Sequence, residues 1–127
     1  MRGVRYQHPL SRDAYLQVVG EANVGMLPFR NGLVWSMSAV DLMIRGVPVI
    51  GPAIGAIPEI LPEELVFDSD EEGYSLLDRL RRDAWFRTSA GVWCQRKTKV
   101  LGSDLVARRL LVHLRSAVQR DRWAVAV

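Results

Sequence analysis

The chain has a single cysteine, Cys94, among its 127 residues. An internal disulfide is therefore excluded, and a reducing compartment is expected. The opening stretch, MRGVRYQHPL, lacks the apolar core of a secretory signal. No run of about eighteen apolar residues occurs, so the sequence contains no pattern for a membrane-spanning helix. Together these absences predict a cytoplasmic protein.

Several patterns that carry chemistry are missing as well. The sequence has no cluster of metal-ligating side chains, no nucleophile-bearing strand-to-helix turn and no Walker phosphate loop. It also has no internal repeat and no low-complexity segment. The formal net charge of +3 is too small to indicate nucleic-acid binding by itself. We therefore expect no metal, no other cofactor and no nucleic-acid partner.

The composition is that of an ordinary globular protein, with 49% hydrophobic and 24% charged residues. A chain of this length fits one domain with a moderate core, so we treat residues 1–127 as a single domain. The charges are unevenly distributed. Acidic residues are concentrated between Glu59 and Asp83, and basic residues are concentrated after Arg79.

Short apolar segments alternate with segments of helical pattern along the chain. Ser11 is a candidate helix cap, and Gly46 is a candidate helix C-terminus. The segment 51–64 is rich in proline and glycine and is expected to be mostly loop. The pattern predicts strands over 4–6, 24–27, 47–50 and 65–67. It predicts helices over 11–22, 68–82, 83–101 and 103–118, with Gly91 as a weak point, and a further helix that begins at Ser36 or Ser38 and ends near Arg45.

This alternation predicts an α/β fold, a Rossmann-like parallel sheet flanked by helices and closed by C-terminal helices over about 83–118. Parallel sheets bind ligands beyond the carboxyl ends of their strands. That rule assigns three loops to the functional edge, over residues 7–10, 28–35 and 51–57.

The last predicted helix has an apolar stripe, Val106, Leu110, Leu114 and Ala117, and an outer face with several arginines. A helix of this kind can pack on its own domain or lie at a membrane surface. Packing on its own domain is the interpretation that we prefer. Peripheral membrane association is the alternative that the same pattern leaves open.

Two stretches carry a resemblance to a known family. VRYQHPLSRDAYLQVVGEANVGMLPF is similar to the strand, G-P-L-S turn, helix and A-D-V-G-L-L-P strand of nucleotide-sugar glycosyltransferases. MSAVDLMIRGVPVIGPAIGAIPEI resembles their L-E-A-M-A-C-G-V-P-V-V segment followed by G-G-I-P-E, and RTSAGVWCQRK and SDLVARRLLVHL resemble their closing helices. The family is the group 1, or family 4-like, glycosyltransferases of the GT-B fold. The resemblance covers the second half of the C-terminal, donor-binding domain.

The resemblance implies a nucleoside diphosphate sugar as the donor. Diphosphate would bind at the helix start over residues 36–38, and Asp41 would contact the ribose hydroxyls. The loop around Gly55 would approach the donor, and an N-terminal acceptor domain would be missing or on another chain. The donor-binding residues implied are Ser36, Met37, Ser38, Asp41, Gly55 and Glu59, with His8, Asn31 and Gly32 as further candidates.

The sequence also departs from the family. The first of the family's two glutamates falls on Leu33, and the loop reads RNGLVWS instead of E-G-F-G. Some candidates have purely structural interpretations. Ser38 and Asp41 fit a helix capping box, His8 fits a neutral turn histidine, and Glu59 fits an acid at a helix start.

The function predicted is therefore the donor-binding portion of a glycosyltransferase that moves a sugar to an acceptor hydroxyl. We expect no turnover from this chain alone, because the family's reaction takes place between two domains. The alternative is a non-catalytic interaction or oligomerisation module derived from the same fold, since a partial sheet leaves an edge open to pairing.

Overall fold

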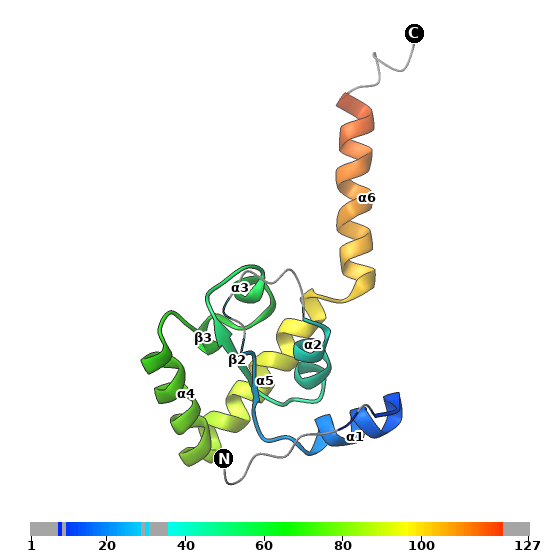
Figure 1. Ribbon diagram of the computed structural model, residues 1–127. Coiled ribbons are helices and arrows are strands. Elements are labelled where there is room, and N and C mark those ends of the chain that lie inside the picture. Colours follow the sequence, from blue (N-terminus) through cyan, green and yellow to red (C-terminus); the bar gives the residue numbers. More distant parts are fainter. Residues whose placement is uncertain (1–7, 9, 29, 31–35, 121–127) are drawn as a thin grey trace.

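The computed structural model describes residues 8, 10–28, 30 and 36–120 (Figure 1). The strand expected over residues 4–6 lies outside this part of the chain. The helices are α1 (Arg12–Glu21), α2 (Met37–Ile44), α3 (Ile57–Ile60), η1 (a 3-10 turn, Glu63–Leu65), α4 (Asp70–Arg82), α5 (Ala84–Val100) and α6 (Ser103–Arg120). The strands are β1 (Gly25–Met26), β2 (Val49–Pro52) and β3 (Val66–Phe67).

The three strands form an all-parallel sheet in the order β1-β2-β3. Gly25 is aligned with Val49 across the first pair, and Gly51 is aligned with Val66 across the second. Helices connect and cover the strands, as expected when parallel strands are joined by crossovers. The predicted α/β, Rossmann-like architecture with C-terminal helices is confirmed.

The start of α1 and the end of α2 lie at the capping residues that the sequence predicted. The Ser11 hydroxyl accepts a hydrogen bond from the Ala14 amide at the start of α1. Gly46 follows α2 with a φ of 73°, a conformation that glycine adopts without strain. Its amide donates to the carbonyl of Met43 and so satisfies one carbonyl of the last turn.

The core lies around the central strand β2, where Val49 and Ile50 are fully buried. α2, α4 and α5 pack around this strand, and the Phe86 and Trp93 rings meet edge-to-face at 5.8 Å between centroids. The segment expected to be mostly loop after β2 is more ordered than predicted. It contains α3 and η1, whose residues Ile57, Ile60 and Leu65 enter the core; the remaining core residues include Leu27, Ala39, Met43, Leu61, Phe67, Leu80, Ala90 and Cys94.

Gly91 is not a weak point of α5, contrary to the sequence expectation. The helix continues through it without a break, and Gly91 is buried. A Cβ atom at this position would overlap the backbone carbonyl oxygen of Gly46. The missing side chain therefore allows α5 to pack directly on the turn between α2 and β2.

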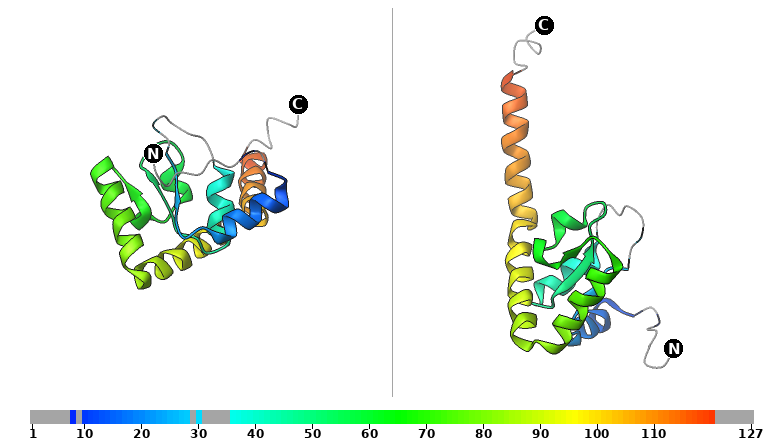
Figure 2. Two further views of the ribbon diagram at one scale, coloured as in Figure 1. Left: turned by 60° about the horizontal axis from the view of Figure 1, so that its bottom comes forward. Right: turned by 90° about the vertical axis from the view of Figure 1, so that its left-hand side faces the viewer.

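The expectation that the last helix packs on its own domain is wrong for the described residues. α6 extends away from the body of the molecule (Figures 1 and 2). Its large apolar side chains are exposed: Leu110 by 56% and Leu114 by 52%. The apolar stripe was predicted correctly, but the structure places no other part of the described chain over it.

Candidate functional site

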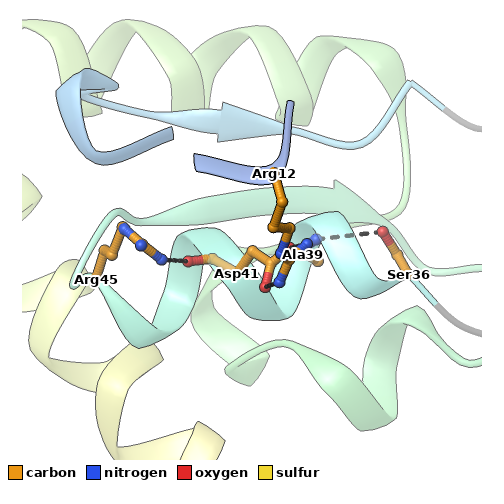
Figure 3. A network of polar contacts seen from close by, with 5 residues as sticks. All are labelled: Arg12, Ser36, Ala39, Asp41 and Arg45. Carbon is orange, nitrogen blue, oxygen red and sulfur yellow. Dashed lines mark hydrogen bonds and ion pairs between the residues drawn. The ribbon is translucent and has the colours of Figure 1, made fainter. Parts of the chain in front are cut away.

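The start of α2 lies at the carboxyl edge of the sheet. The chain leaves β1 at this edge, and α2 then runs back toward the amino end of β2. In Figure 3 the strands point toward the side on which Ser36 lies. The helix start predicted to receive a diphosphate is therefore at the edge where parallel sheets bind ligands.

Ser36 is the N-cap of α2. It is buried, and its hydroxyl accepts a hydrogen bond from the Ala39 amide at 3.3 Å (Figure 3). Met37 and Ser38 form the exposed first turn. The capping box expected between Ser38 and Asp41 is wrong, because the helix begins two residues earlier. The Ser36 hydroxyl is committed to its own helix, whereas the Ser38 side chain faces solvent.

Asp41 is the buried acid of the site, with 10% of its side chain exposed. Both carboxylate oxygens accept hydrogen bonds from the guanidinium of Arg12, each at 3.2 Å (Figure 3). Arg45 also donates to the Asp41 backbone carbonyl at 3.4 Å. The carboxylate predicted to contact ribose is thus held by an arginine from α1, and this bidentate geometry is the strong form of an ion pair.

Arg12 was not predicted as a site residue. Its side chain is 65% exposed, and its guanidinium lies 5.6 Å from the centre of the Tyr15 ring. Arg12 and Asp41 are separated by 29 positions in the sequence. Local patterns do not report a pair this distant. Only the packing of α1 beside α2 brings the two side chains together.

The remaining candidates are arranged more loosely. Gly55 follows β2 in an exposed turn with a φ of 53°, a conformation that glycine adopts without strain. Glu59 is exposed in the first turn of α3, consistent with an acid at a helix start. His8 is exposed. Asn31 and Gly32, together with Leu33, lie outside the described residues.

A small cavity of about 150 Å³ also lies at the carboxyl edge, between the ends of β1 and β3 and the start of α4. None of the predicted donor-binding residues that the structure describes lines it. Among the described residues, the cavity and the start of α2 therefore share no side chain. Its lining residues are Met26, Leu27, Pro28, Arg30, Pro52, Phe67, Asp70, Gly73 and Tyr74.

Cys94 is a thiol packed in the core. Burial raises the pKa of its thiol to about 11, and a hydrogen bond with the Val49 backbone offsets only part of that increase. A thiol with this pKa is neutral at physiological pH. Within the described part of the chain, no three His, Cys, Asp or Glu side chains are grouped to hold a metal ion.

The fold and the site together define a Rossmann-like parallel α/β protein with a helix start and a glycine turn at its ligand edge. No protein-family model matches the chain, and no curated protein has significant sequence similarity to it. The function is therefore inferred from the site geometry and from the motifs of the sequence.

Proposed function

We propose that the chain forms the donor-binding side of a glycosyltransferase that uses a nucleoside diphosphate sugar. The observation that carries the proposal is the position of the α2 start and the Gly55 turn at the carboxyl edge of a parallel sheet. A helix start offers backbone N–H groups and the positive end of a dipole, which together suit a diphosphate. The motif resemblance supplies the nucleotide sugar as the ligand class.

In this proposal the exposed first turn of α2 binds the diphosphate, with the Ser38 hydroxyl as an added donor. Asp41 accepts hydrogen bonds from the ribose hydroxyls. That contact requires Arg12 to share or release the carboxylate, and the largely exposed Arg12 side chain is able to move. Once displaced, the guanidinium is a cation beside the phosphates.

The chemistry proposed is stabilisation of charge in the transition state. Departure of the nucleoside diphosphate leaves an oxocarbenium-like sugar and a developing negative charge on the leaving oxygen. Fixed N–H groups at the α2 start stabilise that negative charge, and the bound geometry positions the sugar for the acceptor. The acceptor side comes from a further domain, so the chain alone binds donor weakly and does not turn over.

A non-catalytic interaction module is the second candidate, and one observation favours it. Two of the side chains at this site, Ser36 and the proposed ribose-binding Asp41, already have partners inside the protein. In this alternative the Arg12–Asp41 ion pair serves only to join α1 to α2.

Titration with uridine and guanosine diphosphates, followed by amide chemical shifts, separates the two candidates. Donor binding predicts shift changes over residues 36–41 at millimolar ligand. Asp41→Ala weakens the binding more than Asp41→Asn, because an amide still accepts hydrogen bonds. Asp78→Asn is a matched control, since Asp78 also pairs with arginines but lies on α4. Absence of shift changes over 36–41 would rule out donor binding and leave the interaction module.

A further inference from the structure

The exposed side of α6 is a continuous apolar face along the helix. Residues three and four positions apart lie on the same side of an α-helix, so a stripe at this spacing forms one surface. We define the apolar face of α6 as Val106, Ala107, Leu110, Leu111, Leu114, Ala117 and Val118. All seven are exposed except Ala117, which is half-buried.

Basic residues flank this face on both sides. Arg108 and Arg115 are seven positions apart and border the edge marked by Leu111, while Arg109 and His113 lie toward the other edge. These four side chains are exposed. The one acidic residue of the helix, Asp104, is in its first turn. Arginine stems can bury their methylene groups beside an apolar surface while the guanidinium reaches an anion.

The helix end next to α6 and the start of α4 on the opposite side of the molecule differ in charge. α5 ends with Lys97 and Lys99 next to the start of α6. α4 begins with three acids, Asp70, Glu71 and Glu72. Figure 1 and the left view of Figure 2 show α4 and α6 on opposite sides of the molecule. α6 is therefore far from the acidic first turn of α4, whose last turn carries three arginines.

A second copy of α6 does not fit this surface well. Two such helices pressed together would place arginines of like charge along both seams. An 18-residue helix is about 27 Å long and about 10 Å wide, so one face offers a few hundred Å². A standard stable interface buries roughly 800 Å² per partner. The arginines beside the apolar face and the small area of that face both favour an extended anionic surface over a second copy as its partner.

We propose that α6 binds in the plane of an anionic lipid bilayer. The apolar face enters the boundary between headgroups and acyl chains, and the flanking arginines contact the anionic headgroups. This combination of an apolar face with an arginine-rich polar face is typical of interfacial helices. Every helix in the described part of the chain is too short or too polar to cross a bilayer, so the association is peripheral. The proposal does not depend on donor binding.

Co-sedimentation with phosphatidylcholine vesicles, with and without phosphatidylglycerol, tests the proposal on the full chain. Two valines of α6 give a matched pair. Val118 is 63% exposed and lies on the apolar face, whereas Val112 is 61% exposed and lies on the polar side. We expect binding to the anionic vesicles only, weakened roughly tenfold by Val118→Asn and unchanged by Val112→Asn. Circular dichroism of both variants checks that the body remains folded.

A second arm addresses the charges. Arg108→Gln combined with Arg115→Gln should weaken binding by roughly tenfold or more, and added salt should do the same to the unaltered chain. Failure to sediment with anionic vesicles overturns the proposal. Equal losses from the two valine variants overturn it as well. The proposal is also overturned if the chain forms a dimer, does not bind vesicles, and becomes monomeric on Val118→Asn. In that case a second copy covers the apolar face.

Discussion

The Arg12–Asp41 pair joins a well-solvated guanidinium to a mostly buried carboxylate, so its two halves are not equivalent. Removing the cation leaves a charge with little access to water, whereas removing the acid leaves a cation that water already reaches. We expect Arg12→Met to lower the free energy of unfolding by about 2 kcal/mol. Asp41→Asn should lower it by no more than about 1 kcal/mol.

Urea denaturation of the two single variants and of the double variant measures this difference. The double variant should be about as stable as Asp41→Asn alone, because no buried charge remains in it. A larger loss from Asp41→Asn than from Arg12→Met would mean that the carboxylate makes other stabilising contacts.

At Gly91, any added side-chain atom would clash with the backbone of Gly46. Gly91→Ala places a methyl group against the Gly46 carbonyl, and neither helix nor turn can yield without moving the core. We expect a loss of about 3 kcal/mol, even though alanine is the better helix former. Gly102→Ala is the control, since its Cβ would lie 3.6 Å from the Lys99 carbonyl oxygen, an ordinary contact. Equal thermal melting of the two variants would contradict the close packing seen here.

The Cys94 thiol should be inert in the folded protein. Its pKa of about 11 is above the usual 9.0, so folding favours the neutral form. The stability that this contributes is complete below pH 9 and is lost as the pH rises through 11. Labelling with a thiol reagent at neutral pH should therefore be slow in buffer and fast in denaturant. Rapid labelling of the native chain would show that the α5 core opens readily.

At the scale of elements, α6 contributes little to the stability of the body. Leu110→Ala and Leu114→Ala should change the free energy of unfolding by less than about 0.5 kcal/mol, because both side chains are exposed. Leu80→Ala is the contrasting control, since Leu80 is fully buried and its truncation should cost about 2–5 kcal/mol. A similar loss in all three, measured in urea without lipid, would show that α6 packs on the body in solution.

The elements also show what a sequence can and cannot predict. The start of α1 and the end of α2 were predicted because the signals, Ser11 and Gly46, lie at the positions that they cap. The Arg12–Asp41 pair, the close approach at Gly91 and the exposure of α6 depend on residues far apart in the chain. An apolar stripe predicts that one face of a helix is removed from water, but it does not predict which part of the chain, partner or membrane covers that face.

At the scale of the whole molecule, the sheet is small and one of its outer strands is β1. Within the described residues, β1 pairs only with β2, so no described strand covers its other edge, and an uncovered edge can pair with a second chain. We expect the apparent mass measured by light scattering to rise with protein concentration. Met26→Lys, which places a charge on the exposed part of β1, should reduce that rise. A compact monomer at all concentrations, with a sharp thermal transition, would instead indicate a self-sufficient domain.

The separation of α4 from α6 has a mechanical consequence. The acidic start of α4 lies on the opposite side from the arginine-rich α6, and this uneven charge gives the molecule an electric dipole that the three arginines in the last turn of α4 reduce. In the field of a negatively charged surface such a dipole experiences a torque, which turns α6 toward the surface before any contact is made. The rotation reduces the orientational search that limits association rates, and it weakens as salt shortens the range of the field. If α6 binds an anionic bilayer as proposed, the net charge of +3 alone therefore understates the steering of the molecule toward that surface.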